Sequence, residues 1–196
     1  MLQILSGLRV LHKHWIIHRD LTPQNLLISE EGILKFSDFG LSRFFAQNHK
    51  PMTKNIVTLH YRAPEILFGA TYYGPQIDIW AVGAILGALV LRNSMFRGAD
   101  DIDQLSMIFS IVGTPTEVNW EGASQLPNYV EFEHTEPQSF KVLFPGMDPH
   151  LLDLLENCLM LDPNKRITLD ECFDHPFFTE SPDPCQPHEI PLPDTL

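Results

Sequence analysis

The sequence predicts a mainly α-helical fold that carries a small β-hairpin. Apolar residues recur along residues 1–13 at the spacing of one helix face. The run 77–91 is apolar nearly all round, which indicates a central helix buried on every side. Between them, the short apolar segments 26–28 and 33–36 are joined by Ser-Glu-Glu-Gly, a pattern typical of a hairpin. Helices therefore dominate, and the hairpin joins the first helix to the rest.

Further helices are predicted at 101–112, where aspartates occupy the first turn, and at 149–160 and 168–173. Pro64 suits the first turn of a short helix. The stretch 41–61 has no clear period and mixes polar residues with proline, which is typical of a long functional loop.

Proline content predicts irregular structure in two places. The section 113–144 carries Pro115, Pro127 and Pro137 and is expected to be mostly loop. The end of the chain, 181–196, contains five prolines and few apolar residues, so it is expected to be disordered.

Composition narrows the classes of function. The chain has 196 residues, 44% of them apolar, enough for one large domain or one lobe of a larger one. With 13 basic and 25 acidic residues its net charge is −12, which argues against non-specific binding to nucleic acids. The longest uncharged run, 79–91, is shorter than the roughly 20 residues that cross a bilayer. We therefore expect neither a nucleic-acid partner nor a membrane partner.

The three cysteines, Cys158, Cys172 and Cys185, lie far apart and lack C-x-x-C or Cys/His metal spacing. Buried free thiols in a reducing compartment are the expected reading. The N-terminus shows no basic stretch ahead of an apolar segment, so an intracellular protein without a secretory signal is expected.

Three short motifs occur in the order that phosphoryl transfer requires. They are the segment HRDLTPQN at 18–25, Asp38-Phe39-Gly40, and Ala63-Pro64-Glu65. Asp20 can accept the proton of a hydroxyl group, while Asn25 and Asp38 offer oxygen ligands to magnesium. The hairpin would hold Asn25 and Asp38 near each other. One such triplet is weak evidence, but three in order are strong.

Each of these residues also has an ordinary structural explanation. Asp20 and Asp38 could sit in turns, and Asn25 could cap a helix. Phe39 is expected to pack against the core and fix the direction of Asp38, while Gly40 supplies backbone freedom for the turn. A plain Asp-x-Gly hairpin is the alternative.

Asp78 lies inside the predicted central helix and needs partners there. We expect it to accept hydrogen bonds from backbone N–H groups of His18 and Arg19, which would fix the catalytic loop from below. An aspartate satisfied in the core without any functional role is the competing interpretation.

From residue 2 to about 178 the sequence resembles the C-terminal lobe of a eukaryotic protein kinase, specifically of the cyclin-dependent group. The resemblance implies an α+β kinase fold in which this chain supplies the helical lobe and lacks the N-terminal lobe. It also places a kinase lobe at 1–178 and a proline-rich tail at 179–196. The matching segments are PQNLL at 23–27, VTLHYRAPE at 57–65, DIWAVG at 78–83 and IVGTP at 111–115, with Trp120.

Within that group, the segments EILFGA at 65–70, DIDQL at 101–105 and LPNYV at 126–130 look most like the kinases that activate other cyclin-dependent kinases and pair with cyclin H. The resemblance implies a nuclear serine/threonine kinase that uses ATP and Mg²⁺. Its implied substrates are other cyclin-dependent kinases and, within general transcription factor II H, the tail of RNA polymerase II.

The resemblance also implies roles for residues outside the three motifs. Thr53 matches an activation-loop phosphorylation site whose phosphate Arg19 and Arg43 would grip, although a merely solvated threonine is the alternative. Glu65 is expected to pair with Arg166 as a structural ion pair.

The segment 57–62 is expected to face the substrate. By resemblance, Val57 and Arg62 suggest a preference for proline after the phosphorylated residue, and the loop that begins at Thr58 does not look like that of a tyrosine kinase.

The sequence departs from the family in three ways. Thr22 stands where the family has a lysine, a loss that typically costs on the order of 10²-fold in rate unless Lys35, Lys54 or a metal ion compensates. His60 stands where the group usually has tryptophan. No G-x-G-x-x-G loop or V-A-I-K lysine precedes Met1, so the isolated chain is expected to be inactive. A non-catalytic binding module and an incomplete gene model are the alternatives.

Overall fold

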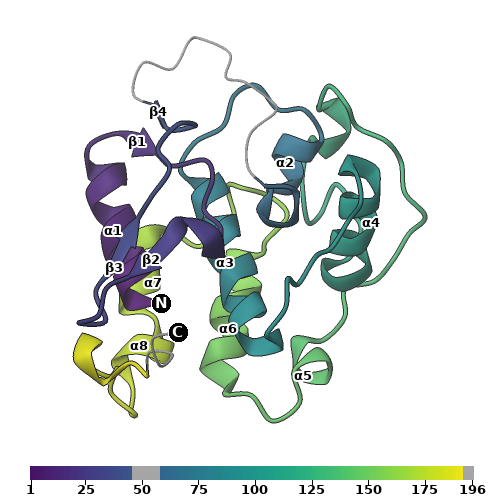
Figure 1. The fold of residues 1–196 in the computed structure, drawn as a ribbon. Helices are drawn as coiled ribbons and strands as arrows, with labels where there is room; N and C mark the ends of the chain where they lie inside the picture. Colours follow the sequence, from purple (N-terminus) through teal and green to yellow (C-terminus); the bar gives the residue numbers. More distant parts are fainter. Residues whose placement is uncertain (46–57, 192–196) are drawn as a thin grey trace.

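The apolar helix α3 (Gln76–Leu91) forms the centre of the fold, and the other helices pack around it (Figure 1). The computed structural model describes residues 1–45 and 58–191. Every residue of α3 from Ile77 to Gly87 is buried, because its sequence, apolar except for Asp78 in this stretch, can be covered on all sides. The helix ends at Arg92, which adopts a left-handed conformation with φ of 55°. The expected central buried helix is confirmed.

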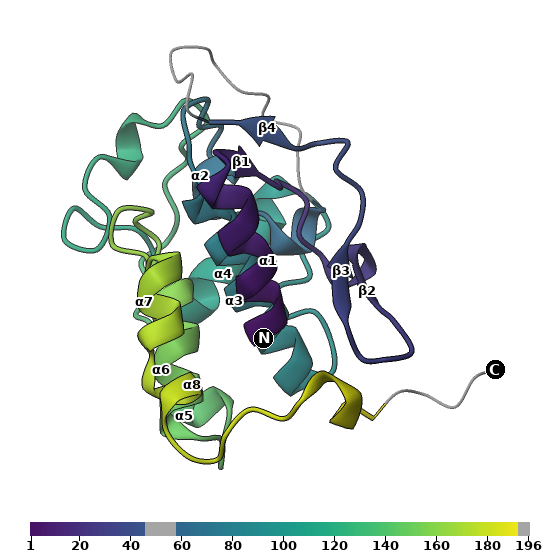
Figure 2. The ribbon, with the colours of Figure 1, turned by 90° about the vertical axis from the view of Figure 1, so that its left-hand side faces the viewer.

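The helix α1 (Leu2–Lys13) contacts α7 (Leu169–Asp174), as Figure 2 shows, and buries Ile4, Leu5 and Leu8. The helix α6 (Pro149–Cys158) packs directly against α3. Gly83 permits this close approach, since a Cβ there would lie 2.7 Å from the Cβ of Cys158. The helices expected at 1–13, 149–160 and 168–173 are confirmed to within one or two residues.

Two helices lie on the side of α3 that faces away from α1 (Figure 1). They are α2 (Pro64–Leu67), which starts at Pro64 as expected, and α4 (Asp101–Val112). Asp100 caps α4 by accepting hydrogen bonds from the backbone nitrogens of Ile102 and Asp103. Phe68 joins these helices to the loop that follows α4, through an aromatic cluster with Phe109, Trp120, Tyr129 and Phe132.

Two antiparallel pairs of short strands lie beside α1 (Figure 2). The strand β2 (Leu26–Ile28) pairs with β3 (Leu34–Phe36) and confirms the predicted hairpin. Gln3 of α1 fixes it by donating to the Gly32 carbonyl and accepting from the Leu34 nitrogen. The strand β1 (Ile16–Ile17) pairs with β4 (Arg43–Phe44), a pairing that the sequence analysis did not foresee.

The remaining elements are short. The 3₁₀ turns are η1 (Pro23–Asn25), η2 (Leu59–Tyr61), η3 (Ala123–Gln125) and η4 (Pro187–Glu189), and the one-turn helices are α5 (Phe140–Leu143) and α8 (Pro176–Thr179). The section 113–144 is therefore mostly loop, as expected. The turn η4 lies within the proposed tail, and its Pro187 carbonyl lies against Gly32. The division of the chain into a lobe and a tail at residue 178 stays a prediction.

Across residues 1–45 and 58–191, no helix is long and apolar enough to span a bilayer. Cys158 and Cys172 are buried free thiols, as expected, but Cys185 is exposed. That expectation was wrong for Cys185 because it lies in the proline-rich end of the chain, outside the helical core.

Candidate active site

Asp78 of α3 supports the loop that carries Asp20. Its two carboxylate oxygens accept the backbone nitrogens of His18, at 2.9 Å, and Arg19, at 3.0 Å. The expected contact is therefore confirmed. The His12 Nε2 atom lies 2.9 Å from the same carboxylate, a third partner that the sequence analysis missed. Asp78 is buried, so these hydrogen bonds offset the cost of burying its charge.

Arg19 is almost completely buried and takes a left-handed backbone conformation, with φ of 67°. Its Nε donates to the Leu41 carbonyl and its Nη1 donates to the Tyr73 hydroxyl at 2.7 Å. Burial raises the pKa of Tyr73, while the positive charges of Arg19 and Arg43 oppose that rise. The Arg19 guanidinium therefore joins the loop at 18–20 to the Tyr73 phenol.

Asp20 is held in one orientation by two neighbouring elements. Its Oδ1 accepts the Thr58 backbone nitrogen at 3.0 Å and the Thr58 hydroxyl at 3.2 Å. The amide nitrogen of Asn25 donates to both the Asp20 carbonyl, at 2.8 Å, and the Asp20 Oδ2, at 3.1 Å. A carboxylate with these donors is a fixed acceptor, which is the state that a general base requires.

His18 connects Asp20 to the second motif. Its Nδ1 accepts the Asp20 backbone nitrogen at 3.3 Å, so its Nε2 must carry the proton and donate to the Ser37 carbonyl at 3.2 Å. The ring is fully buried and contacts the rings of Phe36 and Phe39. Asp20 and the residue before Asp38 are thus joined through one imidazole.

The hairpin brings Asn25 beside Ser37, the residue before Asp38. The Ser37 backbone nitrogen donates to the Asn25 carbonyl at 2.9 Å and so extends the ladder of β2 and β3 by one pair. Because the Asn25 amide nitrogen is used by Asp20, the Asn25 amide oxygen is the atom with which this residue can bind a cation. Asp38 is exposed, and its Oδ1 accepts the Gly40 nitrogen at 3.1 Å.

Two expectations about the second motif were wrong. Phe39 is 48% exposed instead of packed in the core, because its ring contacts that of His18 while about half of its surface faces solvent. The left-handed conformation of the turn belongs to Asp38, with φ of 57°, and not to Gly40. The short Asp side chain tolerates that conformation by bonding locally to the Gly40 nitrogen.

The donor set fits magnesium. Asn25 and Asp38 offer hard oxygen atoms, and Asp38 directly follows the residue that pairs with Asn25. Mg²⁺ is commonly bound by one or two such side chains together with phosphate and water. In the part of the chain that the structure describes, no group of three or more His, Cys, Asp or Glu side chains could hold a metal. A cation bound by Asn25 and Asp38 would therefore need further oxygen atoms from a bound phosphate or from water.

The family lysine is replaced by a buried side chain. Thr22 is only 2% exposed and precedes η1, so no cation stands at this position. Lys35 is exposed on β3, and Lys54 lies outside the described residues.

The substrate-side loop is described only in part. Thr53 and Val57 lie outside the described residues. Arg43 is exposed on β4 and donates to the Ser42 carbonyl. Arg62 donates to Asp101 at the start of α4, at 2.8 Å, and so joins the loop that holds Thr58 to that helix.

Glu65 and Arg166 form a buried bidentate ion pair, as the resemblance implied. The two guanidinium nitrogens donate to the two carboxylate oxygens at 2.8 and 3.0 Å. The Arg166 Nε and both Nη atoms also donate to the carbonyls of Met160, Gln76 and Leu161, so every guanidinium nitrogen has a partner. The pair fastens the segment after the substrate loop to the base of α3.

Comparison with known proteins identifies the family. The family model described as "Protein kinase domain" matches residues 1–178. The chain is 45% identical to cyclin-dependent kinase 7 of Caenorhabditis elegans, in a match that covers 98% of this chain and 58% of that protein. It is 42% identical to cyclin-dependent kinase 7 of Dictyostelium discoideum, in a match that covers 98% of this chain and 54% of that protein. It thus spans little more than half the length of these curated relatives.

A solved structure gives the same result. A chain of the CAK complex from Chaetomium thermophilum bound to ATP-gamma-S superposes with a TM-score of 0.91 and 37% sequence identity, covering 95% of this chain and 59% of that one. This chain belongs to the protein kinase family, and it is a cyclin-dependent kinase 7-like member with the fold of the helical lobe.

Proposed function

We propose that the protein containing this chain is a cyclin-dependent serine/threonine kinase that transfers the γ-phosphate of ATP to protein hydroxyls. The observation that carries the proposal is the fixed carboxylate of Asp20, held by Asn25 and Thr58 on a loop that Asp78 supports from α3. An ordinary turn aspartate does not need such an arrangement, which joins three separate segments of the chain: residues 18–25, Thr58 and α3.

This geometry supports a proposed role for each residue. Asp20 would orient the substrate hydroxyl and accept its proton. Asn25 and Asp38 would hold Mg²⁺, which supplies positive charge next to the transferred phosphate. The Thr58 hydroxyl and backbone nitrogen keep Asp20 aligned, so the substrate-side loop and the base are joined directly.

The finer assignment rests on the resemblance. We infer that the whole protein binds a cyclin, cyclin H by resemblance, and that it acts in the nucleus. We also infer that it phosphorylates other cyclin-dependent kinases and, as part of general transcription factor II H, the tail of RNA polymerase II. The relatives named cyclin-dependent kinase 7 support the cyclin partner, whereas the choice of cyclin, the substrates and the location rest on the resemblance alone. Phosphorylation of Thr53, gripped by Arg19 and Arg43, would be its activating modification.

Thr22 favours a second candidate, a binding module without turnover. A buried threonine offers no positive charge where a kinase of this group has lysine, so substrate could dock without efficient transfer. The acidic net charge and the described part of the substrate-side loop, residues 58–62, would serve either function.

Phosphotransfer from radiolabelled ATP to a peptide of the polymerase tail separates the two candidates. The isolated 196-residue chain should show no more transfer than its Asp20→Asn variant, because ATP lacks the contacts that an N-terminal lobe provides. Joined to the N-terminal part of the Caenorhabditis elegans relative and given a cyclin, the chain should transfer phosphate, and Asp20→Asn should remove that activity. A Thr22→Lys variant of the joined protein should gain up to about 10²-fold in rate.

A binding module without turnover would give a different result in the same experiment. If the joined protein folds, binds the peptide and stays as inactive as Asp20→Asn even with Thr22→Lys, the kinase assignment is wrong. Robust Asp20-dependent transfer by the isolated chain would contradict the expected need for the second lobe.

A further inference from the structure

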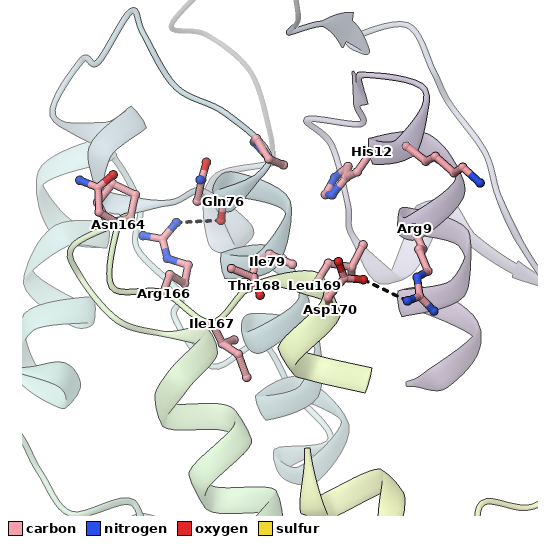
Figure 3. A pocket seen from close by; sticks show the side chains of 13 residues that line it. Arg9, His12, Gln76, Ile79, Asn164, Arg166, Ile167, Thr168, Leu169 and Asp170 are labelled. Atoms are coloured by element: carbon pink, nitrogen blue, oxygen red, sulfur yellow. Dashed lines mark hydrogen bonds and ion pairs between the residues drawn. The ribbon is translucent and has the colours of Figure 1, made fainter. Parts of the chain in front are cut away.

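A cavity of about 560 Å³ lies between α1, the start of α3 and the segment that leads into α7 (Figure 3). Its volume falls within the range of small-molecule sites, which is roughly 300–1,000 Å³. None of the proposed catalytic residues lines it. Ile79, Ile167 and Leu169 supply apolar surface, while Arg9, His12 and Lys13 of α1 supply polar and cationic groups.

The cationic side chains that line this cavity differ in how far a nearby carboxylate neutralises them. Arg9 pairs with Asp170 at 3.0 Å and stacks on the ring of Phe173 at 4.5 Å. Arg166 is neutralised by Glu65 and has all its nitrogens bonded, so it cannot anchor a ligand. Lys13, four residues after Arg9 on the same helix face, makes no ion pair with any described residue. Two like charges at that spacing repel each other, and a bound anion would relieve the repulsion.

The cavity is also connected to the catalytic loop. His12 lines it and donates from Nε2 to Asp78 Oδ2, the atom that accepts the His18 backbone nitrogen; the other oxygen of Asp78 accepts the Arg19 nitrogen. Figure 3 shows Arg9 and His12 on one side of the space, with Asn164 and Arg166 on the other. A ligand that contacts His12 is therefore one hydrogen-bonded residue away from the loop that carries Asp20.

We propose that this cavity binds a small amphiphilic anion, a phosphate or carboxylate on an apolar body, and that His12 and Asp78 couple its occupancy to the backbone at 18–19. Lys13 and Arg9 bind the anionic group, and the apolar side chains cover the body. The net charge of −12 repels anions in general, so binding depends on these local cations and weakens with salt. The proposal does not rest on catalytic activity, since every readout below is made on the isolated chain.

Binding is tested with three probes on the full 196-residue chain: 2-naphthyl phosphate, 2-naphthol and inorganic phosphate. The complete probe should bind saturably, and each half should bind at least about tenfold more weakly, because the site uses both kinds of contact. Absence of saturable binding of 2-naphthyl phosphate up to about 10 mM overturns the proposal. Equal affinity for 2-naphthol overturns the assignment of an anion site.

Variants locate the site. Lys13→Gln should weaken binding of 2-naphthyl phosphate at least about fivefold, whereas Lys141→Gln, an exposed lysine on α5, should leave it unchanged. Asp170→Asn should tighten binding, because it frees Arg9 from its partner. Thermal melting of each variant confirms folding, and equal affinities for the Lys13 and Lys141 variants overturn the proposal.

Amide hydrogen exchange tests the coupling. Saturation with 2-naphthyl phosphate should change the exchange rates of the His18 and Arg19 amides, which donate to Asp78. With the probe concentration raised to saturate each variant, His12→Leu should lose that change, while His12→Gln, which retains a donor, should keep part of it. Unaltered exchange at both amides in the wild-type complex, or the same response in His12→Leu, overturns the coupling.

Discussion

At the scale of single residues, the site depends on a few buried polar groups that each join two segments. Asp78 accepts three donors from α1 and from the loop that follows β1, and Asp20 accepts donors from two elements. A buried carboxylate is tolerated only with such partners. The catalytic loop is therefore fixed by hydrogen bonds that cost stability if any of them is lost.

Asp78→Asn should lower the free energy of unfolding by about 2–4 kcal/mol, because one carboxylate oxygen becomes an N–H₂ group that faces backbone donors. Urea denaturation followed by circular dichroism measures this loss. Asp183→Asn, at an exposed position of the same residue type, serves as the control and should change stability by less than about 0.5 kcal/mol. Equal stability of the two variants would show that Asp78 does not support the loop.

At the scale of elements, the sequence predicted those helices and strands that form for a local reason. The helices 1–13, 101–112 and 149–160 have a period of apolar residues and recognisable first turns, and the hairpin has a turn sequence between two apolar segments. The pairing of β1 with β4 was missed because strands of two residues, separated by 25 residues, leave no periodic signal. Such contacts are set by the tertiary fold.

The site shows the same limit. The order of the motifs predicted Asp20, Asn25 and Asp38 as site residues, and the resemblance predicted the pair of Glu65 with Arg166, which the structure shows. No pattern pointed to the Thr58 contact with Asp20 or to His12 beside Asp78. Phe39 was expected in the core because a motif phenylalanine is apolar, although burial depends on whether other parts of the molecule cover it.

Gly83→Ala should destabilise the chain by about 1–3 kcal/mol, because the new methyl group would lie 2.7 Å from the Cβ of Cys158 and 3.0 Å from Leu159 Cδ2, at the packed contact of α3 with α6. Gly87→Ala, one turn later, is the matched control. Its methyl group would meet the Sδ of Met95, the end of a flexible side chain that can move, and alanine favours the helix.

Urea denaturation of the two glycine variants gives the comparison. Gly87→Ala should remain within about 0.5 kcal/mol of the parent chain. A Gly83→Ala variant as stable as Gly87→Ala would mean that α3 and α6 are not packed as closely as the structure shows.

At the scale of the whole molecule, one continuous core joins the helices. Buried side chains of α1, α3, α4, α6 and α7 belong to the same apolar cluster, which includes Cys158 and Cys172. A core of this kind is expected to unfold as a unit. The two buried thiols, on α6 and α7, therefore report on global unfolding, whereas exposed Cys185 does not.

Thiol labelling tests this cooperativity. Iodoacetamide at neutral pH should modify Cys185 alone in the native chain, and all three cysteines in urea, with Cys158 and Cys172 becoming reactive at the same urea concentration. A Cys185→Ser variant should show no native labelling. Reaction of Cys172 well before Cys158 would instead mean that α7 opens separately from the core.

Stability should also fall in alkali, for a reason that lies in the same pair of thiols. The hydrogen bond with Cys172, followed by burial, holds the pKa of Cys158 well above its ordinary value. Below the unfolded-state pKa of about 9 both states keep the proton, so the full stabilisation is present; as pH rises above it, the unfolded chain alone releases the proton and stability declines. Urea denaturation at pH values from about 7 to 10 should show this decline, and it should be smaller in Cys158→Ala, which has no thiol to ionise. An equal decline in both chains would assign the alkaline loss to other groups.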